Sequence, residues 1–324
     1  MPKVGIPRAL FYYYYYPLWS RFFKNLGAEV IVSPPTNKSI LDDGVRCAVD
    51  EACLPVKVYY GHVMALRNKV DLIFNPRLVS VERKAYICPK LMGLPDMVRW
   101  NVEGLPKMID TTFDLSKQES AVICAAREAG AFLECNVKLI DAAWADASEF
   151  QKEYETLLKK GHLPMDLLQA METGRKLPEN VREDGMSIAV VGHGYNIYDE
   201  YISMGLIRNL RKMGVNVITP DCIPVERSYY YADKLPKKMF WTLGKKLLGS
   251  VLNYIDQGDL DGILYVEAFG CGPDSMIEDL SARYVRRQKT IPFQVLSLDE
   301  HSGEAGIMTR LEAFVDMIGW RGVS

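Results

Sequence analysis

The chain has 324 residues, of which 48% are hydrophobic and 25% charged, and its formal net charge is −2. This length predicts two domains of ordinary size with a large core. The near balance of acidic and basic residues argues against a nucleic-acid partner, which normally leaves a basic excess. The start, "MPKVGIPRALFYYYYYPLW", lacks the sections of a signal peptide, and no stretch approaches the roughly 20 apolar residues that span a bilayer. We therefore expect a cytoplasmic protein with no membrane partner.

The first third of the chain alternates short β-rich runs with helical patterns. Strands are expected at 3–7, 29–34 and 71–76, and helices at about 17–26, 38–52 and 56–68. This alternation predicts a parallel sheet covered by helices. All three strand runs end in proline, so the backbone turns at the carboxyl edge of the sheet, where open α/β sheets place their ligands.

The middle of the chain changes character and the last part resembles the first. Residues 116–185 show mainly helical periodicity with charged faces. Alternation then returns, with strands expected at 187–192, 216–220, 262–267 and 293–298, and helices near 198–213, 239–257, 273–288 and 303–318. We expect two flavodoxin/Rossmann-like α/β domains with parallel sheets, at 1–115 and 186–324. A helical connector at 116–185 joins them, and the cleft between the domains is the expected site.

The seven cysteines fall into two kinds. In a cytoplasmic protein they indicate thiol or metal chemistry rather than disulfides, although the local CxxC signature of zinc sites is absent. Four are followed by proline within two positions, whereas three lie inside helical patterns. The first group is Cys53, Cys88, Cys222 and Cys271, and the second is Cys47, Cys124 and Cys135. A following proline holds a metal-binding thiolate rigidly, as in the Cys-Pro of bacterial ferredoxins, and ordinary structural thiols are the alternative.

The segment "LYVEAFGCGPDSM" makes Cys271 the most suggestive of these thiols. It places Cys271 just past a strand, in a glycine-rich turn that leads into a helix. Backbone N–H groups and the helix dipole would then favour the thiolate. The alternative is an ordinary βα turn in which the glycines only relieve crowding.

Five segments together resemble a known family: "KVGIPRALFYYYYYPLW", "VDEACLPVKVYYGHV", "NPRLVSVERKAYICPKLMGLPDM", "EAFGCGPDSM" and "DEHSGEAGIMTRLEAFVD". They are similar to stand-alone proteins related to the 2-hydroxyacyl-CoA dehydratase components and to the C-terminal regions of their activases. The resemblance covers most of the chain and is thinnest over 116–185. It implies an iron–sulfur cluster held by Cys53, Cys88 and Cys271 between flavodoxin-like domains, in an anaerobic cytoplasm. It also implies an ATP-hydrolysing activase as electron donor, and a homodimer.

Three thiolates would leave one iron of a [4Fe–4S] cubane open for water, substrate or a bridging sulfide, and a double-cubane form is the variant known among relatives. Cys222, the remaining loop cysteine, could instead close the cluster. Polar candidates for the surroundings are Arg8, Lys57, Arg77 and Glu82, of which Arg8, Lys57 and Glu82 are also catalytic candidates. Cations near a cluster raise its potential and can hold an anionic substrate, but each of these groups taken singly reads as solvated surface charge.

Two histidines follow predicted strands. His193, in "VGHGYNIYDEY", lies in a glycine turn where a phosphate could bind, but a tight strand–helix turn is the favoured interpretation. His301, in "LDEHSGEAG", is crowded by acidic residues, and histidine is the side chain best suited to proton transfer at physiological pH, which favours it as a catalytic candidate. It could equally cap the last helix.

We expect an iron–sulfur protein of the 2-hydroxyacyl-CoA dehydratase type, a lyase or reductase component that reduces an acyl-CoA or other small substrate by one electron. The alternative is a non-catalytic electron relay or cluster carrier. A metal-free nucleotide-binding module is disfavoured, because the sequence has neither a GxxxxGK[ST] loop nor a GxGxxG after a strand. Tyrosine runs at 12–16 and 228–233 support the expected homodimer, since tyrosine suits interfaces.

Overall fold

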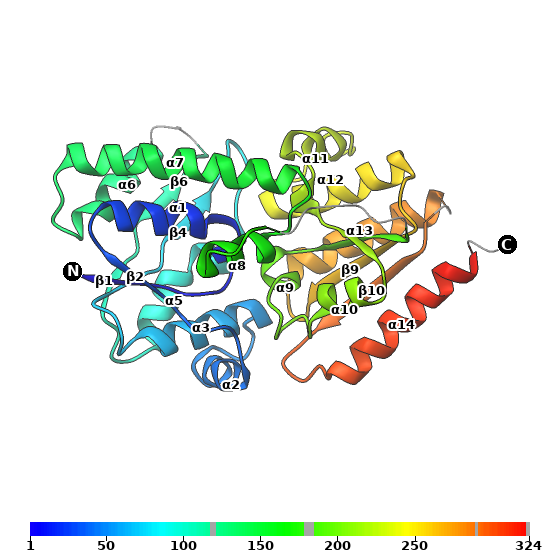
Figure 1. The fold of residues 1–324 in the computed structure, drawn as a ribbon, viewed down its shortest axis with the longest axis horizontal. Helices are drawn as coiled ribbons and strands as arrows, with labels where there is room; N and C mark the ends of the chain where they lie inside the picture. The colour runs from blue at the N-terminus through cyan, green and yellow to red at the C-terminus, as the bar shows by residue number, and fades with distance from the viewer. Residues whose placement is uncertain (117–120, 178–184, 289–290, 322–324) are drawn as a thin grey trace. The chain divides into compact units, whose positions relative to one another are not determined.

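The computed structural model describes residues 1–116, 121–177, 185–288 and 291–321, and it shows a mixed α/β protein. The chain forms two compact units. Unit 1 comprises Met1–Thr156 and Phe240–Thr242, and unit 2 comprises Leu157–Met239 and Leu243–Ser324. Each contains a four-stranded parallel sheet with helices, which confirms the expected flavodoxin/Rossmann-like class (Figure 1). The division into domains at 1–115, 116–185 and 186–324 stays a prediction.

The sheet of unit 1 has the strand order β2-β1-β3-β5. Its strands are β1 (Lys3–Ile6), β2 (Glu29–Val32), β3 (Leu72–Phe74) and β5 (Lys107–Ile109). Val4 pairs with Val30 on one side and Leu72 on the other, so β1 is central. A separate two-stranded sheet joins β4 (Arg77–Ser80) to β6 (Thr112–Asp114). Strands β4, β5 and β6 were not expected from the sequence.

The helices of unit 1 include a close crossing that fixes the start of α3. They are α1 (Tyr12–Asn25), α2 (Lys38–Cys47), α3 (Leu54–Leu66), α4 (Pro89–Met92), α5 (Leu94–Asn101), α6 (Ala121–Ala131) and most of α7 (Val137–Lys159). A Cβ on Gly44 would lie 1.9 Å from the carbonyl oxygen of Lys57, and one on Gly61 would lie 1.8 Å from that of Ile40. Because any side chain would collide with backbone, the α2–α3 crossing requires glycine at both positions.

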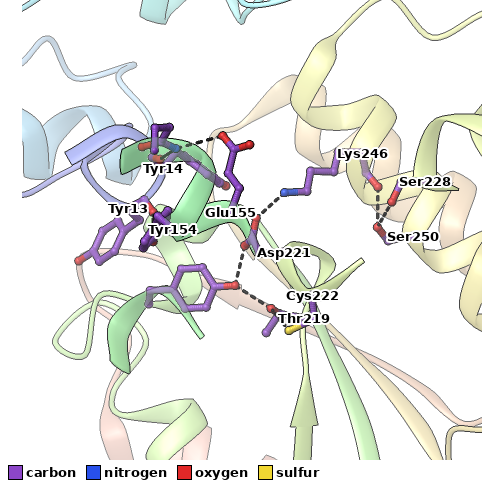
Figure 2. Close-up of polar contacts among 12 residues, drawn as sticks. Tyr13, Tyr14, Tyr154, Glu155, Thr219, Asp221, Cys222, Ser228, Lys246 and Ser250 are labelled. Atoms are coloured by element: carbon purple, nitrogen blue, oxygen red, sulfur yellow. Dashed lines mark hydrogen bonds and ion pairs between the residues drawn. The ribbon is translucent and has the colours of Figure 1, made fainter. Parts of the chain in front are cut away.

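Helix α1 begins five residues earlier than expected and runs through Pro17. Proline has no N–H to give to the carbonyl of Tyr13, one turn back, which is why a helix start near residue 17 was expected. The structure supplies another donor: the Tyr154 hydroxyl on α7 donates to the Tyr13 carbonyl at 3.0 Å (Figure 2). The Gln151 amide likewise donates to the Tyr14 carbonyl at 3.0 Å.

The tyrosine run is largely core. Tyr12, Tyr13 and Tyr16 are buried. Farther along α1, the Trp19 ring lies 4.5 Å from that of Phe74 on β3, between ring centroids. The run at 12–16 therefore stabilises unit 1 through aromatic packing.

The sheet of unit 2 has the order β10-β9-β7-β8. Its strands are β7 (Ser187–Gly192), β8 (Asn216–Ile218), β9 (Gly262–Ala268) and β10 (Phe293–Leu298). The helical segments are the end of α7, α8 (Pro164–Thr173), α9 (Gly194–Ile197), α10 (Leu206–Lys212), η1 (Pro220–Cys222), α11 (Val225–Ala232), α12 (Thr242–Gln257), α13 (Gly272–Gln288) and α14 (Glu304–Arg321). Across the described part of the chain, no helix combines the length and apolarity that a bilayer crossing would need.

The core of unit 2 is mainly aliphatic. Val191, Leu248, Val251 and Ile263 are fully buried at its centre. Helices α11 and α12 also approach closely, because a Cβ on Gly249 would lie 1.9 Å from the carbonyl oxygen of Ser228.

Both sheets follow one order when their strands are numbered along the chain: second, first, third, fourth. In this order the connections diverge between the first and third strands, which is the topological switch point where open α/β sheets bind ligands. The switch point lies between β1 and β3 in unit 1, and between β7 and β9 in unit 2.

Candidate functional site

The three cysteines that the sequence assigned to a cluster all lie directly before a helix. Cys53 precedes α3, Cys88 precedes α4, and Cys271 precedes α13. Each helix has a proline in its first turn: Pro55, Pro89 and Pro273 respectively.

This placement corrects one expectation about Cys53. The preceding helix was expected at 38–52, but α2 ends at Cys47, and Pro55 lies in the first turn of α3. Proline suits the first helical turn, because the N–H that it lacks has no partner there in any case. The thiols of Cys53 and Cys271 therefore lie at the positive ends of long helices, which stabilises a thiolate.

Unit 1 brings Cys53 and Cys88 together. Burial raises the pKa of the Cys53 thiol, the backbone amide of Val56 and the ammonium of Lys90 lower it, and a charge on Cys88 raises it. Lys90 also donates to the carbonyl of Glu51 at 2.7 Å, so its side chain reaches back over the turn before Cys53. The two thiolates oppose each other's charge, and a shared metal centre would relieve this opposition.

Lys57 and Arg8 also lie in unit 1, and the backbone of each forms a hydrogen bond. Lys57 is 8% exposed, one turn into α3, and its amide donates to the carbonyl of Cys53 at 3.2 Å. The Arg8 amide, just past β1, donates to the Ser33 hydroxyl at 2.8 Å, and its guanidinium carbon lies 5.2 Å from the centre of the Tyr12 ring.

The other polar candidates have structural contacts. Arg77 pairs with Asp96 at 2.7 Å, and its guanidinium also donates to the Met92 carbonyl at 2.7 Å. Glu82 forms a β-bridge with Ala85. His301, in unit 2, is exposed, and its amide donates to an Asp299 carboxylate oxygen at 2.8 Å, in a turn before α14. The assignment of Arg8, Lys57, Glu82 and His301 as catalytic candidates stays a prediction.

A buried histidine in α3 was not among the expected residues. Both ring nitrogens of His62 are in hydrogen bonds, Nδ1 with the Ser33 hydroxyl at 2.8 Å and Nε2 with the Thr36 hydroxyl at 2.9 Å. Burial, with a smaller contribution from Arg8, lowers the pKa of His62 to about 3. The imidazole is therefore neutral and joins α3 to the segment after β2.

Unit 2 assembles a second group of chemistry-bearing side chains. His193 directly follows β7, Cys271 follows β9, and Asp274 lies in the first turn of α13. One donor atom from each of the three residues lies within 4.8 Å of the others. Because β7 and β9 are adjacent and parallel, both strands deliver their following residues to the switch point.

Two tyrosine side chains contact His193 and Asp274. The Tyr265 hydroxyl, inside β9, donates to Asp274 Oδ1 at 2.8 Å. The His193 ring stacks on Tyr195 with 5.0 Å between centroids, and its Nε2 lies 3.7 Å from the same Asp274 oxygen, beyond hydrogen-bond length.

Several polar atoms of this group remain unpaired. His193 is 6% exposed and Asp274 fully buried, yet His193 Nδ1 and Asp274 Oδ2 form no hydrogen bond with any described residue. Both amide atoms of Asn196, in α9, are likewise unpaired among those residues. Burial lowers the pKa of His193, against the opposite effect of Asp274 and Asp221. A neutral imidazole and a carboxylate can both bind a metal ion.

Sequence reasoning underrated His193. The Gly-His-Gly turn alone is compatible with simple packing. A functional role for His193 is indicated only when it is considered together with Cys271, because each of the two residues follows a buried strand. The missing information was that β7 and β9 are neighbours in the sheet.

Cys222 belongs to a neighbouring polar network after β8. Asp221 accepts a hydrogen bond from the Tyr198 hydroxyl at 2.5 Å and pairs with Lys246. The Cys222 thiol lies 3.6 Å from the Thr219 hydroxyl, and burial raises its pKa. Figure 2 shows Lys246 reaching Asp221 from α12, with Thr219 and Cys222 beside it. A cluster-closing role for Cys222 stays a prediction.

Comparison with known proteins places the chain in a family. Residues 3–223 match the model of the CoA enzyme activase uncharacterised domain (DUF2229). The matched segment contains Cys53, Cys88 and His193, and it ends before Cys271. No curated protein matches the chain. Since the match covers well over half of its length, the chain belongs to the CoA enzyme activase uncharacterised domain family, which is related to the activase/dehydratase superfamily.

Proposed function

We propose that the chain is an iron–sulfur protein of the 2-hydroxyacyl-CoA dehydratase type, acting in an anaerobic cytoplasm and receiving low-potential electrons from an ATP-hydrolysing activase. One observation carries the proposal: Cys53, Cys88 and Cys271 share the same local placement, directly before a helix with proline in its first turn. Membership of an activase-related family supports the choice of partner.

The residues present fit such a group. Cys53, Cys88 and Cys271 would hold the cluster, [4Fe–4S] or a double-cubane form, which when bound supplies one-electron chemistry at an iron that carries no protein thiolate. Lys90 and the Val56 amide stabilise the Cys53 thiolate, as their effects on its pKa indicate. The Cys53 residue is 6% exposed, so its thiolate is protected from water and oxidants.

Burial has the largest effect on the pKa of the Cys53 thiol in unit 1, and the charge of Lys90 opposes it. Lys57 keeps its side chain mostly buried one turn from Cys53, while neutral His62 adds no charge. An ammonium close to bound thiolates, such as that of Lys90, would offset their negative charge and so favour the reduced state.

The test is anaerobic purification or reconstitution followed by iron and labile sulfide analysis and electron paramagnetic resonance. We expect Cys53→Ser and Cys88→Ser to lose iron and sulfide together, because serine is a much weaker iron ligand. Cys124→Ser is the matched control, since Cys124 is an exposed thiol on α6 of the same unit. A colourless protein without iron or labile sulfide after reconstitution would overturn the proposal.

An enzyme component and an electron relay can be told apart by their electron paramagnetic resonance spectra. A lyase or reductase component should change its resonance spectrum when an acyl-CoA or another small substrate is added to the reduced protein. A relay or cluster carrier should be reduced by an activase and ATP without such a change. The proposed homodimer is tested by light scattering, where the mass of one 36.7 kDa chain would contradict it.

A further inference from the structure

We propose that His193, Cys271 and Asp274 form a binding site for a single divalent transition-metal ion, of the Zn²⁺ or Fe²⁺ kind, at the carboxyl edge of the unit 2 sheet. An imidazole nitrogen, a thiolate and a carboxylate are the ligand types that such ions take in proteins. None of the three donors comes from unit 1, so the site is independent of Cys53 and Cys88.

The spacing of the donors favours one ion. Their ligand atoms lie within 4.8 Å of one another. Metal–ligand bonds of about 2.0–2.3 Å require the donors to close in by about 1 Å, which small side-chain rotations supply. Cubane thiolates, by contrast, bind different irons, so a tight group of mixed donors matches a mononuclear centre better.

His193 and Asp274, the two most buried residues of the group, each have one polar side-chain atom without a hydrogen-bond partner among the described residues. His193 Nδ1 and Asp274 Oδ2 are without hydrogen-bond partners within the described ranges, although His193 is 6% exposed and Asp274 fully buried. Buried polar atoms are nearly always paired, and unpaired ones mark a missing ion or water, or a functional site. A simple histidine–aspartate pair does not account for them, because its closest approach is 3.7 Å.

Neighbouring residues orient the Asp274 carboxylate and the Cys271 backbone, as second-layer hydrogen bonds do around metal ligands. Tyr265 donates to the other Asp274 oxygen at 2.8 Å, which orients the carboxylate and leaves Oδ2 for a metal. Cys271 accepts the Ser275 amide on its carbonyl at 3.0 Å, so the helix start holds the backbone of the thiol. Three protein ligands would leave one tetrahedral position for water or another ligand.

In the proposed function Cys271 is also a ligand of the iron–sulfur cluster. Its thiolate cannot bind the cluster and the single metal ion at the same time. Loading of Zn²⁺ before reconstitution should therefore reduce the iron taken up.

The experiment is a Co²⁺ titration of the full-length, metal-free protein under argon, with Co²⁺ as the spectroscopic probe. We expect about one Co²⁺ per chain with a thiolate-to-cobalt absorption band in the near ultraviolet. Cys271→Ser should remove this band, and His193→Gln and Asp274→Asn should each weaken binding at least tenfold. Cys222→Ser is the matched control, since Cys222 is a thiol of the same unit after the neighbouring strand, and it should leave the band unchanged.

A second measurement on the unmodified protein guards against variants that fail to fold. Zn²⁺ should protect Cys271 from iodoacetamide, as read by peptide mass mapping, and should leave exposed Cys124 reactive. Loss of Co²⁺ binding in Cys53→Ser, absence of the thiolate band in unmodified protein, or absence of protection would overturn the inference. Co²⁺ binding without cluster formation would overturn only the proposed function, and a cluster without Co²⁺ binding only this inference.

Discussion

Units 1 and 2 share their strand order, and each buries a histidine, but the two imidazoles have opposite surroundings. His62 uses both ring nitrogens in hydrogen bonds to Ser33 and Thr36. His193 has an Nδ1 that pairs with none of the described residues and an Nε2 too far from Asp274 for a hydrogen bond. A saturated imidazole stabilises a fold, whereas an unsaturated one keeps its lone pair for a ligand. The fold alone therefore does not say which histidine is functional, and the hydrogen-bond partners do.

The largest expected effect tests whether the two units are alike in how they pack. Gly61→Ala in unit 1 and Gly249→Ala in unit 2 should each destabilise the protein by about 3 kcal/mol or more, because the new Cβ would meet backbone oxygens. Thermal or urea unfolding measures the loss. Gly306→Ala, on α14, has open space around its Cβ and should be neutral or slightly stabilising. An unchanged unfolding midpoint for Gly61→Ala would mean that the α2 and α3 backbones do not require glycine at this position.

The histidines themselves provide the next test. In metal-free protein, His62→Leu should cost about 2–3 kcal/mol, since it removes two buried hydrogen bonds. His193→Leu should cost less than about 1 kcal/mol, because the imidazole has few partners to lose. Urea unfolding of both variants measures the difference, and equal losses would contradict the contrast between the two sites.

Acid provides a test of His62 without removing it. Its pKa is about 3 in the folded protein, against an ordinary value of 6.5. The unfolded chain therefore binds a proton first as the pH falls, so the stability is intact above pH 6.5 and declines through the window from 6.5 to about 3. The slope is about 1.4 kcal/mol per pH unit, or about 2 kcal/mol by pH 5. Urea midpoints between pH 7 and 5 should fall less for His62→Gln than for unmodified protein, and parallel curves would argue against a neutral His62.

The smallest expected effect concerns the hydrogen bond between Tyr154 and the Tyr13 carbonyl in unit 1. Tyr154→Phe removes the hydroxyl that serves the Tyr13 carbonyl in place of the N–H missing from Pro17. We expect a loss of about 1 kcal/mol in the free energy of unfolding. Tyr230→Phe is the control, because this side chain is 62% exposed, and its change should be negligible. Equal effects of the two would mean that the Tyr154 bond does not support α1.

The elements that the sequence predicted have local patterns. All seven expected strands are present, and each end lies within two residues of the expected one, since each strand is a β-rich run bounded by turn residues. The start of α1 was wrong because the donor that permits Pro17 comes from Tyr154, far along the chain. The helix expected at 38–52 was too long for a related reason: Pro55 marks the start of α3, and a proline alone does not tell a start from a stop.

The local placement of the three cysteines was predictable, but the group that Cys271 forms with His193 and Asp274 was not. Proline after Cys53, Cys88 and Cys271 is a local signal, and all three do precede helices. The partnership of Cys271 with His193 and Asp274 depends on β7 lying beside β9, and strand order is a property of the whole sheet. Whether Cys53, Cys88 and Cys271 share one cluster stays a prediction for the same kind of reason.

The segment Phe240–Thr242 makes unit 1 discontinuous along the chain, and this has a consequence for biosynthesis. The Tyr86 amide donates to the Phe240 carbonyl at 2.8 Å, and the Thr242 amide donates to the Tyr86 carbonyl at 3.0 Å, two residues before Cys88. A ribosome must therefore translate through residue 242 before the loop carrying Cys88 acquires these backbone partners. Until then the nascent polypeptide presents this thiol on a loop that lacks these backbone contacts.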